Sequence, residues 1–214
     1  MTVKVFPYGP LGSNMYVLIS NACWFLIDPS CKPDAVFMSR AADELKAKEL
    51  KGIIITHGHF DHLAACGLWS EKFPDVPVYI HPEDAICLKD PRKNCSLDFA
   101  GPETFDITPE DIMDLNGGVI DGLKITVLHT PGHCKGQCAI IFEDTEREDL
   151  RDVMFTGDLL FKGSIGRTDL YDGDYKEMQR SLEMLKSIEK DYTVLPGHGP
   201  SSTLNIEKAT NPFL

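Results

Sequence analysis

The feature that most constrains this chain is a string of metal-ligand side chains, THGHFDH, which runs from Thr56 to His62. It places three imidazoles and one carboxylate within six residues, directly after the apolar run 53–55. A short apolar run of this kind predicts a buried strand. Four ligand-type side chains at the end of such a strand would be costly to desolvate without a partner. Imidazole and carboxylate suit zinc, iron and manganese, so the string predicts a metal site.

Three later turns carry the same kinds of side chain. The segments TPGH, TGD and PGHG contain His133, Asp158 and His198. Each segment follows an apolar run, so each predicts a His or an Asp held at a tight turn after a strand. The chain has seven histidines, and five of them belong to these four motifs. The motifs are therefore predicted to form one site.

The motifs supply enough ligands for two ions. We predict that His57, His59 and His133 hold the first ion with three neutral imidazoles and leave a position open for water. Asp158 is predicted to bridge this ion to a second one, because a carboxylate can hold two cations roughly 3.5–4 Å apart. A water shared between two such ions loses a proton near neutral pH and becomes a nucleophile.

The second predicted ion site is richer in oxygen and combines Asp61, His62 and His198. Asp61 and Asp158 are the candidate catalytic carboxylates. The expected cofactors are two divalent metal ions, zinc first, with iron or manganese as alternatives that the ligand types also suit. Metals in this arrangement would polarise a carbonyl group and stabilise the oxyanion that develops on it.

Four other residues could be mistaken for members of the site. His81 and His129 are predicted to be structural, although His129 could orient a neighbour through a hydrogen bond. Asp28 ends an apolar run before a proline, so it is either a turn residue or a partner that orients a ligand. Cys134 is not expected to bind metal, because His133 beside it already fits the pattern.

Composition limits the class of partner. The formal charge of −12 and the lack of a tract rich in Lys or Arg argue against nucleic acid. No apolar stretch is long enough to cross a membrane or to serve as a signal peptide. Seven cysteines, an odd number without a C-x-x-C motif, indicate reduced thiols in a cytoplasmic compartment. The expected partner is a small molecule, and the oligomeric state is not predicted.

Short β-branched runs alternate with helical stretches along the chain, which predicts a layered α/β domain. Residues 15–20 and 24–29 are expected to pair as a β-hairpin across a polar turn. Residues 91–118 contain several prolines and a Gly-Gly pair that break any regular period. This region is predicted to be a loop or insertion that borders the site.

Helices are predicted over three other ranges. The range 34–51 has approximate helical spacing of its apolar residues, and Gly52 would end that helix. The range 175–188 has its apolar residues on one face, with Asp174 as the expected N-cap. A last short helix is predicted over 201–209.

The order of the motifs, H-x-H-x-D-H followed by His, Asp and His, resembles the metallo-β-lactamase superfamily. The segments 157–161 and 163–170, the PGHGP ending and the tail 211–214 are most similar to its short, single-domain glyoxalase II-like branch. The resemblance implies a four-layer αββα sandwich formed by one domain over 1–214. It implies no C-terminal helical domain of the kind that helps hold glutathione in full-length glyoxalase II. It also implies that the seven residues of the motifs are the ligands of two metals.

The activity that the resemblance implies is hydrolysis of a thioester, S-D-lactoylglutathione, to D-lactate and glutathione. Without the helical domain, either the region 91–118 binds the substrate or the substrate is different. Lys135, Lys162 and Arg167 are cations close to the motifs in sequence, so they are candidates to meet a substrate carboxylate. The alternative for each is exposure to solvent or, for Arg167, pairing with Asp169.

Other functions of this fold are alternatives. A mononuclear iron dioxygenase of glutathione persulfide would use His57, His133 and Asp158 as a facial triad. A zinc β-lactamase is disfavoured because such enzymes usually lack an Asp in the slot of Asp158. A nucleic-acid phosphodiesterase conflicts with the acidic charge. The intact set of His and Asp ligands disfavours a module that reduces oxygen or nitric oxide, and also a pure binding protein.

Overall fold

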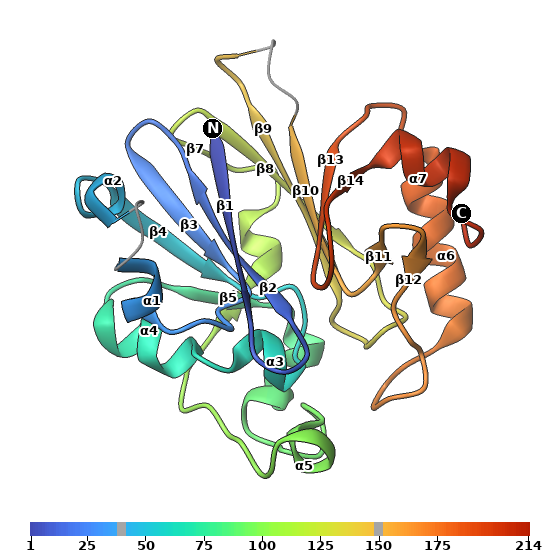
Figure 1. Cartoon of the computed structure of the whole chain (residues 1–214), viewed down its shortest axis with the longest axis horizontal. Coiled ribbons are helices and arrows are strands. Elements are labelled where there is room, and N and C mark those ends of the chain that lie inside the picture. The colour runs from blue at the N-terminus through green and yellow to red at the C-terminus, as the bar shows by residue number, and fades with distance from the viewer. Residues whose placement is uncertain (38–41, 148–151) are drawn as a thin grey trace.

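The computed structural model of the chain describes residues 1–37, 42–147 and 152–214. It contains two six-stranded sheets that lie face to face, together with one small hairpin. In Figure 1, the helices α1 and α4 flank the first sheet, and α6 and α7 flank the second sheet on the opposite side of the molecule. The four-layer αββα arrangement that the sequence resemblance implies is therefore confirmed.

The first sheet has the strand order β1-β2-β3-β4-β5-β6. Its strands are β1 (Thr2–Tyr8), β2 (Ser13–Ile19), β3 (Cys23–Ile27), β4 (Glu49–Ile54), β5 (Val78–Ile80) and β6 (Glu110–Asp111). β2 and β3 pair antiparallel with Tyr16 opposite Ile27, so the predicted hairpin is confirmed. From β3 to β6 neighbouring strands are parallel.

The second sheet has the strand order β14-β13-β10-β9-β8-β7. Its strands are β7 (Val119–Ile120), β8 (Leu123–His129), β9 (Cys138–Asp144), β10 (Val153–Gly157), β13 (Thr193–Pro196) and β14 (Ser202–Thr203), and the small hairpin is β11 (Leu160–Phe161) with β12 (Ser164–Ile165). β9 is antiparallel to both β8 and β10, and β13 is parallel to β10. The carboxyl ends of β8, β10 and β13 therefore lie at the same edge of the sheet.

The helical segments are short apart from α6. They are α1 (Pro33–Phe37), α2 (Ala42–Lys46), α3 (Phe60–Leu63), α4 (Cys66–Lys72), the 3-10 helix η1 (Pro82–Leu88), α5 (Ser96–Phe99), the 3-10 helix η2 (Ile112–Leu115), α6 (Tyr175–Ser187) and α7 (Leu204–Thr210). α6 begins where the sequence predicts, because the Asp174 carboxylate accepts from the backbone N–H groups of Lys176 and Glu177. Over the described residues, no helix is long and apolar enough to cross a membrane.

Two helix predictions need correction. The helix predicted over 34–51 is wrong at its end, because β4 begins at Glu49 and Gly52 lies inside that strand. Parallel pairing with β3 and burial of Leu50 override the helical spacing there. Residues 38–41 of the same prediction lie outside the described residues. The last helix begins at Leu204 rather than at 201, because the preceding residues pair with β13 as β14.

The region 91–118 is partly ordered into regular elements. It contains α5, β6 and η2, so the region is not only a loop. Asn94 holds the start of this region, because its side-chain amide donates to the carbonyl oxygens of Cys87 and Glu103 at 2.9 and 3.0 Å.

Three apolar cores separate the four layers, and alternation along the strands divides the side chains between them. On β2, Val17 packs into the first core with Trp69 of α4, whereas Leu18 faces the second sheet and packs with Phe142 of β9. The third core lies between the second sheet and the helices α6 and α7, and it contains Leu182. These cores fix the strands, and the strands in turn fix the turns that follow them.

Gly132 links the fold to one of the motif turns. Its φ is +142°, and a Cβ added to it would lie 2.4 Å from Cα of Met178 in α6. We expect Gly132→Ala to lower the free energy of unfolding by about 1–3 kcal/mol, because helix backbone cannot move aside as a side-chain tip can. The measurement is the urea midpoint of the variant against that of the parent chain.

Gly67 in α4 offers the matched control, because nothing lies within 4 Å of a Cβ added there. We expect Gly67→Ala to be neutral or to raise the free energy of unfolding by up to about 1 kcal/mol. Equal urea midpoints for the two variants would contradict the close packing of the Gly132 turn against α6.

Candidate metal centre

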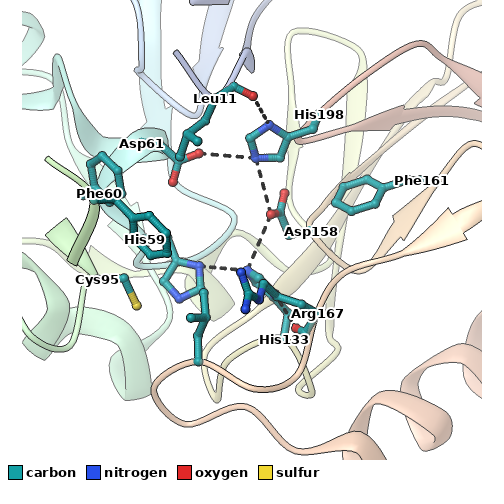
Figure 2. A pocket seen from close by; sticks show the side chains of 12 residues that line it. Leu11, His59, Phe60, Asp61, Cys95, His133, Asp158, Phe161, Arg167 and His198 are labelled. Carbon is teal, nitrogen blue, oxygen red and sulfur yellow. Dashed lines mark hydrogen bonds and ion pairs between the residues drawn. The ribbon is translucent and has the colours of Figure 1, made fainter. Parts of the chain in front are cut away.

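The side chains that the motifs predict as ligands follow four strands of the two sheets. The first sheet contributes the string 57–62, which spans the turn after β4 and the helix α3. The second sheet contributes His133 after β8, Asp158 after β10 and His198 after β13. The structure brings all seven together at one edge of the sandwich, and Figure 2 shows five of them around a common cavity.

One group consists of three histidines. The ligand nitrogens of His57, His59 and His133 all lie within 4.8 Å of one another, and the three residues are buried. Nε2 of His133 lies 2.8 Å from Nδ1 of His59. This is the set that the sequence predicts for the first ion.

A second group combines Asp61, His62 and His198. Nε2 of His198 lies 3.3 Å from Nε2 of His62 and 3.3 Å from Oδ2 of Asp61. Asp158 lies between the two groups, because its Oδ2 is 3.5 Å from Nε2 of both His133 and His198. Its Oδ1 is 3.5 Å from Nε2 of His62. The carboxylate thus contacts both groups, and the sequence predicts that it is the bridge between two ions.

Two observations test whether these residues fit a metal. Tetrahedral zinc ligands at their usual bond length lie roughly 3.3–3.4 Å from one another, and the contacts of 3.3 and 3.5 Å are close to that spacing. In addition, Nε2 of His57, Nε2 of His59 and Oδ1 of Asp158 are buried without a hydrogen-bond partner among the described residues. A cation would give His57 and Asp158 the partner that burial otherwise denies them. The donor set therefore fits divalent ions.

Backbone carbonyl groups hold two of the imidazoles in the orientation that a metal needs. Nδ1 of His133 donates to the carbonyl oxygen of Arg167 at 2.8 Å, and Nδ1 of His198 donates to that of Leu11 at 3.1 Å. A neutral imidazole that donates from Nδ1 leaves its Nε2 lone pair free. In both residues that free nitrogen faces Asp158.

Asp28 orients a third imidazole, that of His62. This buried carboxylate lies 3.0 Å from Nδ1 of His62, and it accepts from the backbone N–H and the hydroxyl of Thr56 at 2.7 and 2.8 Å. Of the two roles that the sequence leaves open for Asp28, the structure shows the orienting one. It ties the ligand string to the end of β3, where Asp28 adopts a φ of +50°.

Electrostatics keep two of the ligands unprotonated. Burial lowers the pKa of His57 well below its usual value, and the neighbouring His62 and His59 lower it further. Burial likewise lowers the pKa of His59 to about 3, and His133 adds to the shift. These imidazoles are therefore neutral near pH 7 and can offer a lone pair.

The second group behaves differently because it contains carboxylates. Burial is the largest single effect on His62 and opposes its charge, but Asp61, Asp28 and Asp158 together outweigh burial and raise the pKa of His62 to about 9. The same balance raises the pKa of His198 to about 10, with Asp158 as the largest favourable partner. Burial raises the pKa of Asp61 and Asp158, but His62 and His198 together with other neighbours outweigh burial, and they hold both pKa values below the usual value, that of Asp158 at about 2. Without metal, this group holds protons between its anions.

Asp84 is a buried residue of the site that sequence reasoning missed. One oxygen accepts from the backbone N–H of Gly58 at 2.7 Å and from the thiol of Cys134 at 3.0 Å. The other accepts from the backbone N–H of Gly136 at 2.6 Å. Asp84 therefore ties the turn of the first two histidine ligands to the turn of His133. The signal in the sequence is weak, because Asp84 lies in η1 with no other motif around it.

The residues outside the motifs behave largely as predicted. His81 and His129 stack on each other with ring centroids 4.0 Å apart, and Nε2 of His129 lies 2.7 Å from the carbonyl oxygen of Lys135. Within the described part of the chain, neither histidine belongs to a group that could hold a metal ion. Cys134 does not either, because its thiol is directed to Asp84.

A cavity of about 360 Å³ opens onto the two groups of ligands. The residues that line it are Leu11, His59, Phe60, Asp61, Cys95, Phe99, His133, Asp158, Phe161, Arg167, Leu170 and His198. Cys95 and Phe99 belong to the region 91–118, so the prediction that this region borders the site is confirmed. The lining side chains around the predicted ligands are mostly apolar: Leu11, Phe60, Phe99, Phe161 and Leu170.

Of the three predicted substrate-binding cations, Arg167 alone lines the cavity. It pairs with Asp169 through two contacts of 2.6 and 2.8 Å, which is the alternative role that the sequence offers. Lys135 lies 3.5 Å from Asp172, and Lys162 is exposed. A role in substrate binding is thus not supported for Lys135 and Lys162.

Comparison with known proteins agrees with the site. The family model described as Metallo-beta-lactamase superfamily matches residues 8–198. The probable metallo-hydrolase YqgX of Bacillus subtilis is 33% identical, with 100% of this chain and 98% of that protein covered. The hydroxyacylglutathione hydrolase GloC of Haemophilus influenzae is 32% identical, with 100% and 98% covered.

Two solved structures have a similar fold. The B3 metallo-beta-lactamase BLEG-1 superposes with a TM-score of 0.84 at 32% identity, covering 100% of this chain and 99% of that one. TTHA1623, solved in a di-iron-bound form, superposes with a TM-score of 0.79 at 34% identity, covering 99% of this chain and 100% of that one. This chain shares its fold with both proteins, although the two carry different names.

Metal binding should be linked to protons at the second group. A metal needs unprotonated nitrogens, whereas His62 and His198 hold protons up to pKa values of about 9 and about 10. We therefore expect the affinity for zinc to rise with pH from about pH 6 to about pH 8. Titration against a competing chelator measures it, and an affinity that does not change over this range would contradict His62 and His198 as ligands.

The role of Asp84 is testable without touching a predicted ligand. Asp84→Asn keeps the shape of the side chain but makes it a weaker acceptor for its three hydrogen bonds. We therefore expect metal affinity to fall about 10- to 100-fold. The matched control is Asp98→Asn on the exposed face of α5, which should leave metal affinity unchanged. Equal affinities for the two variants would show that Asp84 does not hold the ligand turns.

Proposed function

The chain belongs to the metallo-β-lactamase superfamily, and on that premise we propose that it is a metal-dependent hydrolase with two ions that cleaves thioesters. The observation that carries the proposal is the position of Asp158. Its carboxylate contacts His133 of the first group and His62 and His198 of the second. One carboxylate shared by two sets of ligands supports a site for two ions rather than one.

Each group would hold one divalent ion, zinc first, with iron or manganese as alternatives. Ions in such a site supply a water of lowered pKa and a Lewis acid for the carbonyl oxygen. The chain itself contributes the orientation of the ligands through Asp28, Asp84 and two backbone carbonyl groups. It also excludes water from the ligand side of the cavity, because His57 and His62 are fully buried.

The lining of the cavity favours a thioester over an ester or an amide. Apart from the predicted ligands, the titratable side chains that line it are Cys95 and Arg167. Burial raises the pKa of the Cys95 thiol, and the hydrogen bond to Asp169 raises the pKa of Arg167. Neither releases a proton near neutral pH, so neither can act as a general acid. A thiolate leaves without protonation, because its pKa is near 8.5.

A small thioester is the proposed substrate, and nucleic acid is not a proposed partner. The relative named hydroxyacylglutathione hydrolase GloC makes S-D-lactoylglutathione the first compound to test. The similarity to BLEG-1, a B3 metallo-beta-lactamase, makes a β-lactam the second. A β-lactam amide leaves a nitrogen that needs a proton, so the same cavity favours it less.

The test is the release of thiol from S-D-lactoylglutathione, measured on separate samples of the chain loaded with zinc, iron or manganese. We expect turnover by the parent chain, and we expect Asp158→Ala to lose bound metal and more than about 100-fold in activity. The reason is that removal of a residue that only hydrogen-bonds to a metal ligand already lowers metal affinity or activity about 10- to 100-fold. A cephalosporin assayed under the same conditions should be cleaved more slowly.

His81→Ala is the matched control, because His81 stacks on His129 away from the two groups. It should change metal content and activity by less than about twofold. A fully metallated and active Asp158→Ala protein would contradict the two-ion site. Faster cleavage of the cephalosporin than of any thioester would contradict the choice of substrate class.

A further inference from the structure

A second cavity adjoins the first one at Asp61 and extends away from the other predicted metal ligands. It has a volume of about 290 Å³ and shares Leu11, Phe60, Asp61 and Phe99 with the first cavity. It reaches the turn between β1 and β2 on one side and α5 on the other, and in Figure 1 α5 lies below α3. Figure 2 shows Leu11 and Phe60 on the Asp61 side of the first cavity, opposite Phe161. We call the second cavity the side lobe.

The side lobe is lined mostly by apolar groups that water reaches. Tyr8, Leu11 and Phe99 are 42%, 48% and 52% exposed, although they are large and apolar. The Phe99 ring stacks on Phe60 with centroids 6.3 Å apart, so α5 and α3 form one continuous apolar wall. A contiguous exposed apolar surface next to a reactive centre indicates a binding site.

The charges of the side lobe disfavour an anionic ligand in the part of the lobe that lies beyond the metal ligands. Its two charged lining residues, Asp61 and Glu103, are both acidic. Among the described residues that line either cavity, Arg167 is the one lysine or arginine, and Asp169 already pairs with it. Beyond Asp61 and the ion that it would hold, a carboxylate or phosphate in the side lobe would therefore meet the acidic Glu103 and no unpaired lysine or arginine of the described lining.

We infer that the side lobe binds the apolar acyl chain of a thioester substrate. This inference rests on the proposed thioester hydrolysis and names the substrate class within it. A thioester has two arms, and the thiols that cells acylate carry charged amine, carboxylate or phosphate groups. The uncharged arm that an acidic, apolar lobe accepts is therefore the acyl chain, and the polar thiol arm lies toward the open mouth. An unbranched acyl chain fits this lobe better than a short hydroxyacyl group does.

The experiment is a chain-length series on one neutral thiol. S-acyl N-acetylcysteamines with acetyl, butanoyl, hexanoyl and octanoyl groups are hydrolysed by the metal-loaded chain, with S-D-lactoylglutathione alongside. Burial of each added methylene should raise kcat/KM by about fourfold until the lobe is filled. Binding of the matching S-alkyl thioethers, which cannot be hydrolysed, should strengthen in the same order.

Two variants on one helix test the location. Phe99→Asp places a charge in the side lobe, so it should reduce the ratio of octanoyl to acetyl kcat/KM by more than about tenfold. Leu97→Asp is the matched control, because Leu97 is 48% exposed on the same helix and lines neither cavity. It should leave the ratio and the activity on the acetyl compound unchanged.

The outcomes separate this inference from the proposed function. Hydrolysis of the thioesters with a flat or falling dependence on chain length would overturn the acyl-chain site and leave the hydrolase standing. An equal effect of Leu97→Asp and Phe99→Asp would overturn the location in the side lobe. If no thioester were hydrolysed, the proposed function would fail, and binding of the thioethers alone would then test whether the side lobe is an apolar binding site. Binding that strengthens with chain length would support that site. Binding that does not depend on chain length would overturn it.

Discussion

The burial of seven ligand-type side chains at one edge of the sandwich is the constraint on which the rest of the structure depends. Two carboxylates and five imidazoles share a space in which the ligand atoms of each group lie within 4.8 Å of one another, with individual contacts as short as 2.8–3.5 Å. Without a cation, the first group leaves buried nitrogen unpartnered and the second group holds protons between its anions. Cations satisfy both groups at once, so the arrangement is explained by the ions that it would bind.

The sandwich supplies the rigidity that this arrangement needs. Four strand ends carry the ligands, and the apolar cores on both sides of each sheet fix those ends. Two buried carboxylates then hold the turns: Asp28 orients His62, and Asp84 joins the turns around Gly58 and Gly136. The side lobe, where we propose that the acyl chain binds, is lined in part by short segments outside this frame, such as α5. On this proposal, the ligand side chains lie on the fixed frame, whereas the contacts that select the substrate lie on surface segments.

Much of the site could be predicted from the sequence, because H-x-H-x-D-H and the three later turns carry their chemistry within a few residues each. The sequence also places α6 correctly, since its cap and apolar face are local. It fails for residues 49–51, where pairing with β3 overrides helical spacing. It misses Asp84, whose three partners come from distant turns and leave no local pattern. The side lobe is missed for the same reason, because α5 and the β1–β2 turn meet only in the folded chain.

The measurement that tests the central claim most directly is the number and spacing of the ions. Metal analysis of the purified chain, combined with X-ray absorption at the metal edge, reports both. The account predicts two ions per chain, roughly 3.5–4 Å apart and bridged by Asp158. A single ion held by His57, His133 and Asp158, with the second group empty at saturating metal, would contradict it. That result would place the chain among proteins that use this fold with one metal.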